Sequence, residues 1–406
     1  MLLVANIPTP WYVLVAVFGG SNTRPRGGAV LSSSRQAEAR IRQICCLGLG
    51  GVAIMPALLR ELHALVPSCS NTFFWTDEKL QLSGICDENP DADQFGSLYF
   101  QEFYNRRETE VHPGFTHSMR FDRGVTSRDS AITVDKSTFY KSDLYNLIFR
   151  QLGYDDFLRL IIREGGRPLG ALQLWRGPGD PPFTADQIRC LSRLEPFLAH
   201  ALAQAPDLRG PLVPSGETAL IIADRDATLL HLSRHARRLL RRALTGGMTL
   251  PGVTPAALPG PVAQLCRALT GIFSEADCDR APVWRYRNSC GGFIFRAYCL
   301  ESGNAPSSLI GVTITHEEPL PLRLMRGMER LPLSARQSEV CLQMASGRSY
   351  REIAAQLKIS RETAIAHGRS VYDKLGIHNR DQLTAVLLAS QSTTADKAGS
   401  DSEYTA

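Results

Sequence analysis

The most sharply punctuated part of the chain is its C-terminal segment, where several short helical stretches each follow a residue that begins helices. Ser334 stands three residues before Gln337, and Ser349 stands three residues before Glu352. Both spacings are those of a capping box, in which each side chain satisfies an unpaired backbone N–H of the first turn. Ser360 is placed to cap a third helix. The segment therefore predicts helices near 335–346, 350–357 and 361–375, and a fourth that begins at 379.

The third predicted helix separates into two faces. Ala364, Gly368, Val371 and Leu375 fall at positions i, i+4, i+7 and i+11, so they share the face that packs on the first two helices. The opposite face carries Arg361, Glu362, Ile365, Ala366, Arg369 and Asp373. Two helices joined by a tight turn, with the second free to lie in a groove, form the helix-turn-helix arrangement, so this face is predicted to read DNA.

The same segment resembles the LuxR-type helix-turn-helix transcription regulators. The resemblance rests on Glu339, Gly347, Ser349, Glu352, Ile353, Ala354, Leu357, Ile359, Ser360, Thr363, His367, Lys374, Leu375 and Gly376. It implies a four-helix DNA-binding module over residues 331–390, whose third helix enters the major groove and whose fourth usually contributes to dimerisation. Ala364-Ile365 stands where the family commonly has Val-Lys, and Ser370 where it often has Asn. The resemblance therefore implies DNA binding without implying a shared DNA target.

The candidate DNA-contacting residues lie on the third predicted helix and at the ends of its neighbours. They are Ser349, Lys358, Arg361, Glu362, Thr363, Ile365, Ala366, Arg369 and Lys374. Arg361 and Arg369 are expected to contact bases or phosphates, while Ile365 could contact a thymine methyl group. Eight Lys and Arg against five Asp and Glu between positions 331 and 389 suit phosphate contact. The alternative is a solvated helical surface whose charges have no partner.

Residues 36–205 predict an α+β domain. The expected elements are helices at 37–47 and 55–66, a hairpin at 71–76 and 80–85, a helix at 95–104, a strand at 115–121, a helix at 139–152, strands at 157–163 and 169–175, and a helix at 185–204. The motif Gly48-Leu-Gly50-Gly-Val-Ala53 follows a helix rather than a strand, so we interpret it as a loop and not as a dinucleotide site. The element order, with its last strand followed by Pro182-Phe-Thr and a long helix, resembles a GAF-type sensory domain.

A GAF-like fold implies a small-molecule cavity beside its sheet, and the domain is rich in aromatic residues that could line one. The candidates are Phe73, Phe74, Trp75, Phe95, Tyr99, Phe100, Phe103 and Tyr104. The alternative is that these side chains belong to the ordinary hydrophobic core.

The middle of the chain predicts a second sensory domain. Residues 206–216 are expected to be a linker because of their Pro and Gly content. Residues 217–318 are expected to hold two strands, two helices and three further strands, an order similar to that of PAS-type sensors. Residues 319–330 are expected to be an amphipathic connector. Residues 1–35 are expected to be a disordered or mis-started extension, and residues 391–406 a disordered tail.

The predicted fold class is thus multidomain, with α+β sensory domains, GAF-like and then PAS-like, before an all-α four-helix helix-turn-helix domain. We expect a cytoplasmic homodimer that binds double-stranded DNA under the control of a possible small-molecule effector. The alternatives are a signal-independent scaffold and an enzyme with a DNA-binding tail. The sequence has no G-x-S-x-G, H-E-x-x-H or P-loop motif, and its ten cysteines form no C-x-x-C pair.

We therefore predict no catalytic residues, no metal and no cofactor. His112, His117 and Asp122 lie close in sequence without metal-site spacing, and we expect them in surface or hairpin positions. No membrane association is expected either, because the apolar run 11–18 is too short to cross a bilayer.

Overall fold

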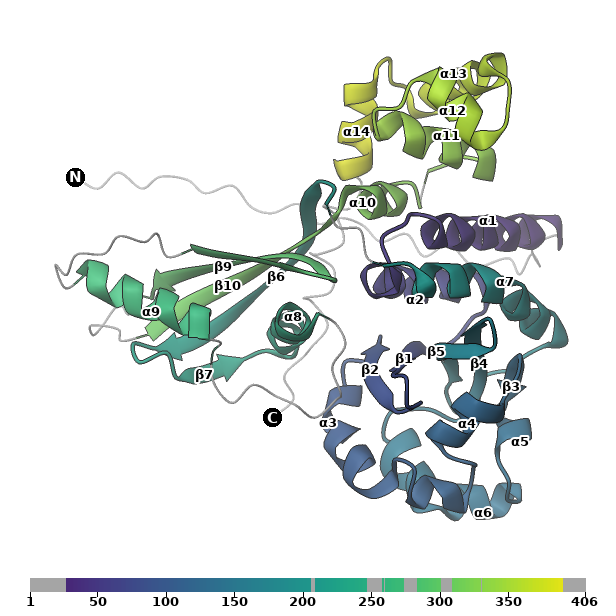
Figure 1. Cartoon of the computed structure of the whole chain (residues 1–406), viewed down its shortest axis with the longest axis vertical. Coiled ribbons are helices and arrows are strands. Elements are labelled where there is room, and N and C mark those ends of the chain that lie inside the picture. The colour runs from purple at the N-terminus through teal and green to yellow at the C-terminus, as the bar shows by residue number, and fades with distance from the viewer. Residues whose placement is uncertain are drawn as a thin grey trace, which may run out of the picture.

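The computed structural model describes residues 27–205, 209–246, 258, 260–273, 283–300, 309–329 and 331–389. Within these residues the chain forms two α+β domains and a C-terminal helical domain (Figure 1). The first helix, α1 (Gly27–Cys45), begins ten residues before its expected start at 37. Residues 27–35, which were expected to belong to a disordered or mis-started extension, are therefore helical. Residues 1–26 and the predicted tail 391–406 lie outside the described residues.

The first domain is built on a five-stranded antiparallel sheet with strand order β2-β1-β5-β4-β3. Its strands are β1 (Ser70–Thr76), β2 (Leu82–Asp87), β3 (Val125–Ser127), β4 (Asp156–Glu164) and β5 (Arg167–Arg176). The helices α1, α2 (Gly51–Leu65) and α7 (Ala185–Ala203) pack together on one face. The motif Gly48–Ala53 is loop only in its first half, where Gly48 and Gly50 have φ of 73° and 77°. Its second half, from Gly51, is the first turn of α2, and a helix rather than a strand precedes the motif.

The other face of this sheet is covered by short helices (Figure 1). These are α3 (Ala92–Leu98), a π-helical turn (Tyr99–Phe103), a 3-10 turn (Arg107–Glu110), α4 (Phe115–Phe121), α5 (Arg128–Ala131), α6 (Lys136–Lys141) and a second π-helical turn (Tyr145–Phe149). The predicted strand at 115–121 is wrong, because this segment is α4. Phe115 and Met119, four residues apart, both face the core cluster under this layer, which is helical spacing.

The predicted helix at 139–152 is likewise divided. Ser142 has an extended backbone, with ψ of 151°, and ends α6 there. Its Oγ accepts a hydrogen bond from the Tyr145 N–H at 3.2 Å, so the side chain caps the turn that follows. The stretch predicted as one helix is therefore divided at Ser142 into α6 and the second π-helical turn.

The second domain is built on a sheet of the same strand order, β7-β6-β10-β9-β8. Its strands are β6 (Leu212–Asp224), β7 (Leu229–Leu232), β8 (Val283–Asn288), β9 (Gly291–Cys299) and β10 (Leu309–Pro319). The helices α8 (Arg234–Thr245) and α9 (Gly260–Phe273) bury their apolar residues against it. In β9, Phe293, Phe295 and Ala297 are buried in the core under these helices, and Ile294 on the other face of the strand is buried as well.

The strands β6 and β10 continue beyond the sheet as a two-stranded ribbon. Leu212 pairs with Pro319 and Val213 with Glu318. Part of the stretch 206–216, predicted to be a linker, is therefore strand, because a partner far away in sequence supplies the pairing that local composition does not reveal. The ribbon leads directly into α10 (Leu320–Gly327), a helix that lies within the stretch 319–330 expected to be the connector.

Helix α10 contacts all three domains (Figure 1). Leu322, Leu324 and Met325 are buried in a single core that also includes α1, α2 and α7 of the first domain and the C-terminal helices. The Arg323 guanidinium donates to the Leu388 carbonyl, and Arg326 pairs with Glu318 at the end of β10. Helix α10 therefore joins the two upstream domains to the C-terminal domain through direct packing contacts.

Glu318 is the most deeply buried charged group at this junction, being 2% exposed. Burial raises the pKa of Glu318 to about 7, although Arg326, Arg60 and Arg323 lower it. A carboxyl whose pKa is raised on folding stabilises the fold fully below its unfolded pKa of 4.5, and this contribution is lost as the pH rises to about 7.

The Glu318→Gln variant should remove this pH dependence, because glutamine mimics the protonated acid. Between pH 5 and pH 8 the free energy of unfolding of the parent should fall relative to that of the variant by about 1 to 3 kcal/mol. Urea denaturation across this range measures the difference. Glu78→Gln is the matched control, since Glu78 is exposed. Parallel curves for the parent and Glu318→Gln would show that the buried carboxyl does not titrate in this window.

Candidate functional site

The C-terminal domain consists of α11 (Ala335–Ala345), α12 (Tyr350–Leu357), α13 (Arg361–Leu375) and α14 (Arg380–Ala389). Both predicted capping boxes form, at Ser334 with Gln337 and at Ser349 with Glu352. Ser360 accepts a hydrogen bond from the Thr363 N–H at 3.0 Å and so caps α13. The first three helices therefore begin where the sequence predicts, and α14 begins at Arg380, one residue after its predicted start.

Helix α13 packs through the predicted face. Ala364, Gly368 and Val371 are buried, and Leu375 packs against the same core. Gly368 lies so close to the ring of Tyr350 on α12 that an added Cβ would fall 2.7 Å from Cε1 and 2.9 Å from Cζ. This close approach fixes the angle between α12 and α13 and holds the opposite face of α13 outward.

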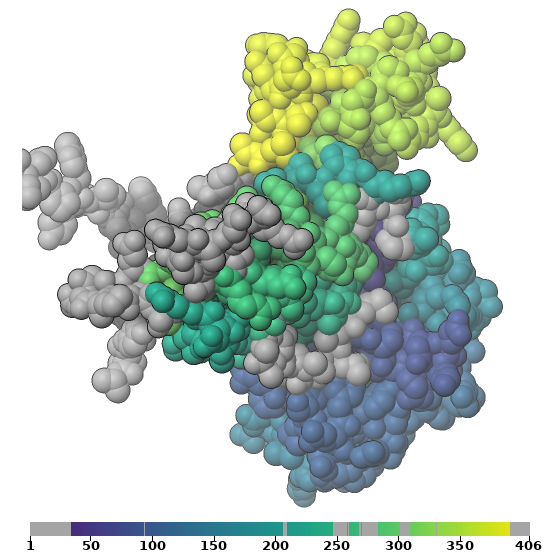
Figure 2. Space-filling view, turned by 60° about the vertical axis from the view of Figure 1, so that its left-hand side comes forward, coloured from purple at the N-terminus to yellow at the C-terminus, as the bar shows by residue number. Residues whose placement is uncertain are grey.

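The outward face of α13 is open to solvent. Arg361, Glu362, Thr363, Ala366 and Arg369 are exposed, and Ile365 is half-buried. Among the described residues, neither Arg361 nor Arg369 has a hydrogen-bond or ion-pair partner. They are eight residues apart, which is about 12 Å along a helix. Helix α13 lies at the end of the molecule away from the first domain (Figure 1), and the domain that carries it projects from the other two (Figure 2).

The other candidate residues of this domain have contacts within the protein. The Lys374 ammonium donates to the Pro332 carbonyl and to Gln337 Oε1, each at 2.9 Å, so it ties the end of α13 to the start of α11. The Ser349 hydroxyl takes part in its capping box. Lys358 is exposed in the turn before α13, with φ of 51°. Arg361 and Arg369 are thus better placed to contact DNA than Lys374.

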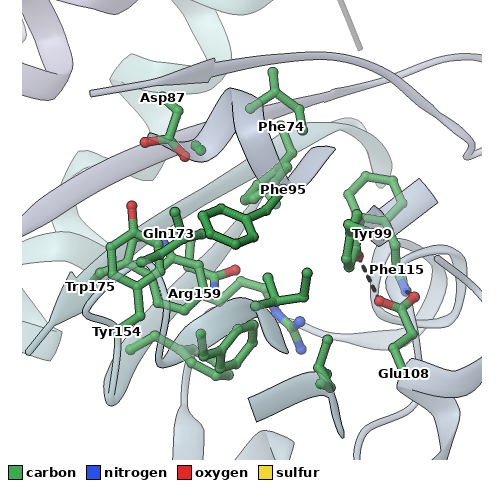
Figure 3. Close-up of a pocket in the computed structure, with 18 of the residues that line it drawn as sticks. Phe74, Asp87, Phe95, Tyr99, Glu108, Phe115, Tyr154, Arg159, Gln173 and Trp175 are labelled. Carbon is green, nitrogen blue, oxygen red and sulfur yellow. Dashed lines mark hydrogen bonds between the residues drawn. The ribbon is translucent and has the colours of Figure 1, made fainter. Parts of the chain in front are cut away.

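A cavity lies in the first domain, between the sheet and the layer of short helices (Figure 3). Its volume is about 120 Å³. Most lining residues are apolar or aromatic, from β1, β2, β4, β5 and the short helices. The two π-helical turns, at 99–103 and 145–149, form part of its wall.

Four of the eight aromatic residues proposed for a pocket line this cavity, namely Phe74, Phe95, Tyr99 and Phe100. Phe73 and Trp75 do not, because side chains alternate along β1 and these two point to the opposite face, into the core under α2. Phe103 is buried in the core of the helical layer and does not reach the cavity surface, although other members of the same core line it. The Tyr104 hydroxyl instead accepts a hydrogen bond from the Leu82 N–H at 2.7 Å.

Buried acid and imidazole groups stand at one end of the cavity. Glu108 is fully buried and accepts hydrogen bonds from the Tyr99 hydroxyl at 2.6 Å, the Asn105 N–H at 2.7 Å and the Phe115 N–H at 2.9 Å (Figure 3). Burial raises the pKa of Glu108, although these donors oppose the shift. The three hydrogen bonds occupy both carboxyl oxygens and position the turn that carries Tyr99.

His112 lines the cavity and is 9% exposed, so the predicted surface or hairpin position is wrong. Its Nδ1 accepts a hydrogen bond from the Gly114 N–H at 3.0 Å. Burial lowers the pKa of His112 to about 3, with Arg159 contributing. The ring is therefore neutral near pH 7 and serves as part of the wall.

The sequence-based list missed the polar residues that the sheet contributes to this cavity. Arg159 on β4 and Gln173 on β5 both line it, and both interrupt apolar strands. A polar residue in a buried strand is itself a signal, since such a residue needs a partner. That signal could have found both of them.

The comparisons with known proteins match one end of the chain. Residues 331–387 match the model of the family described as "Bacterial regulatory proteins, luxR family". The C-terminal domain is therefore a LuxR-type helix-turn-helix domain, the class of module that its four helices and exposed α13 define. This family consists of regulatory proteins, in agreement with the expectation that the chain is not an enzyme.

Two curated relatives match the same region. The "Fimbriae Z protein" of Salmonella typhimurium is 42% identical over 53 residues, which are 13% of this chain and 25% of that protein. YhjB of Escherichia coli K12, a protein of the HTH type, is 44% identical over 55 residues, which are 14% of this chain and 28% of that protein. The chain thus spans only about a quarter of the length of the curated relatives it matches.

Solved structures give only weak likenesses. Escherichia coli SdiA is 11% identical, with 83% of this chain and 87% of that chain covered, at a TM-score of 0.23. The Vibrio cholerae VqmA dimer is 19% identical, with 42% and 80% covered, at a TM-score of 0.14. Scores this low support no inference about the upstream domains.

Among the described residues, no group of three or more His, Cys, Asp or Glu side chains could hold a metal ion. In the same part of the chain, every helix is too short or too polar to cross a bilayer.

Proposed function

We propose that this chain is a transcription regulator that binds a specific DNA site as a dimer through α13. The observation that carries the proposal is that Arg361 and Arg369, on the third helix of a LuxR-type domain, are both exposed and have no hydrogen-bond or ion-pair partner among the described residues. Arginine donates two parallel hydrogen bonds to guanine O6 and N7, the commonest specific contact in the major groove. Ile365 beside them adds an apolar contact surface of the kind that a thymine methyl group fits.

The upstream residues are proposed to form the controlling part. Residues 36–205 are assigned as GAF-like and residues 217–318 as PAS-like, supported by two antiparallel sheets that share one strand order. The cavity of the first domain is proposed to bind a small-molecule effector. Support for control comes from the shared core, in which Gln36 of α1 donates to the Leu333 carbonyl at 2.7 Å. Occupancy of the cavity would change DNA binding through α1, α2 and α10.

Equilibrium titration of DNA fragments at fixed salt tests this function. The full chain should bind a subset of fragments from the genome that encodes it about 1,000-fold or more tightly than random sequence. The protected sequence should hold two related half-sites about one helical turn apart, as a two-fold symmetric dimer requires. Equal affinity for all fragments would contradict specific binding, and protection of a single unrepeated half-site would contradict the dimer.

A further inference from the structure

Two polar side chains stand next to each other on the cavity side of the first domain's sheet. Arg159 on β4 pairs in register with Gln173 on β5, so their Cβ atoms lie on the same face at adjacent positions. They are 8% and 7% exposed. Both point into the cavity in Figure 3.

The hydrogen-bonding capacity of this pair is largely unused. Of the Arg159 guanidinium, only Nη2 has a partner, Asp122 Oδ2 at 2.8 Å, and the buried Nε has none among the described residues. The Gln173 carboxamide has no hydrogen-bond partner in the part of the chain that the structure describes. The nearby Ser118 Oγ, also lining the cavity, is buried without a partner. Buried polar groups in proteins are normally hydrogen-bonded, so these groups are available to bind a ligand that enters the cavity.

The groups that remain free are mainly donors. Arg159 offers only N–H groups, and Gln173 offers an N–H₂ beside its carbonyl. The acids of the lining are already occupied, because Glu108 accepts three protein donors, and Asp87 accepts from the Thr72 hydroxyl and the Asn89 N–H. A ligand cation would therefore find no free carboxylate, whereas a ligand acceptor would find free N–H groups.

The charge of Arg159 is already balanced by Asp122. A bound anion would enter a buried apolar site that has no unpaired cation to compensate it, which is costly. The remainder of the wall is aromatic and aliphatic, including Phe74, Phe95 and Trp175. A volume of about 120 Å³ is close to that of an apolar protein cavity, roughly 150 Å³, that binds benzene.

From this juxtaposition we propose that the cavity binds a small neutral molecule with one apolar ring or short chain, whose carbonyl or amide oxygen accepts hydrogen bonds from Arg159 and Gln173. The proposal rests on the proposed function, since it names the chemical class of the effector. It assigns the selectivity of the site to two adjacent positions on β4 and β5 rather than to the aromatic walls.

A panel of four single-ring compounds tests the assignment on the full chain by calorimetric titration. Acetophenone carries the carbonyl, toluene lacks it, benzoate is an anion and benzylamine is a cation. Acetophenone should bind about 5- to 10-fold more tightly than toluene, as expected for one net hydrogen bond to a buried donor, and both charged compounds should bind more weakly than toluene. Equal binding of acetophenone and toluene, tighter binding of either charged compound, or no binding of any compound at millimolar concentration would overturn the proposal.

The Gln173→Leu variant locates the effect. It removes the amide at nearly constant volume, so the preference for acetophenone over toluene should fall to about 2-fold or less while toluene binding is retained. Gln101→Leu is the matched control, because Gln101 is exposed and does not line the cavity. An unchanged preference in Gln173→Leu would overturn the assignment. DNA titration of the same preparations separates the proposed DNA-binding function from the proposed ligand class. Specific DNA binding without a preference for acetophenone over toluene would refute only the ligand class.

Discussion

Replacing Arg361 and Arg369 together by alanine should remove most of the specific DNA affinity of this chain. Each arginine that contacts a base contributes about 1 to 3 kcal/mol of discrimination, so the double variant should bind its site at least about 30-fold more weakly. The effect should be much smaller on random sequence, where only phosphate contacts are lost. Titration of both DNAs at one salt concentration measures the two losses separately.

The fold should tolerate this double change. Both side chains are exposed and have no partner within the described residues, so stability should change by no more than about 0.5 kcal/mol. Arg361 in the first turn of α13 even opposes the helix dipole, so the fold gains nothing from its charge. Arg285→Ala is the matched control, an exposed arginine of the second domain. Unchanged affinity in the double variant would show that this face of α13 does not read DNA.

Replacing Gly327 by alanine should disrupt the junction between α10 and α14. A Cβ at this position would overlap the Leu387 carbonyl oxygen and would lie 2.9 Å from its carbon and 3.0 Å from its Cα, all backbone atoms that cannot rotate away. In an isolated helix the same change would stabilise by roughly 1 kcal/mol. Here overpacking should cost about 1 to 3 kcal/mol or more and should part the two helices.

Thermal denaturation and hydrogen exchange of α14 measure the outcome. The C-terminal domain should exchange faster or unfold at a lower temperature, while the sheets of the two upstream domains should keep their protection. Gly210→Ala is the control, since a Cβ there meets no atom within 4 Å. Protection of α14 equal to that of the parent would contradict the close packing of α10 on α14.

The helix starts of the C-terminal domain and the two faces of α13 could be predicted, because they depend on residues a few positions apart in the sequence. Ser334 with Gln337, Ser349 with Glu352, and Ser360 each define a helix start through bonds spanning three residues, and all three form. The two faces of α13 follow in the same way from helical spacing.

Features that depend on distant partners could not be predicted in this way. The ribbon formed by Leu212 and Pro319 needs the pairing of two strands about a hundred residues apart. The sequence marks Lys374 only as a candidate DNA contact, and its hydrogen bonds to Pro332 and Gln337 depend on how the fold brings the start of α11 to the end of α13. Aromatic content identified the region of the cavity, and four of the eight candidates line it. Phe73 lies on the other face of β1, and which face of a strand meets the cavity depends on how the helices cover the sheet.

The central claim is that occupancy of the first-domain cavity and DNA binding by α13 are coupled. The most direct test measures the DNA affinity of the full chain with and without saturating acetophenone, and the acetophenone affinity with and without saturating DNA. Linkage requires both affinities to change by the same factor, and typical couplings of 1 to 3 kcal/mol predict a change of about 5- to 150-fold. Equal factors in this range are the predicted result, and two unchanged affinities would contradict the claim.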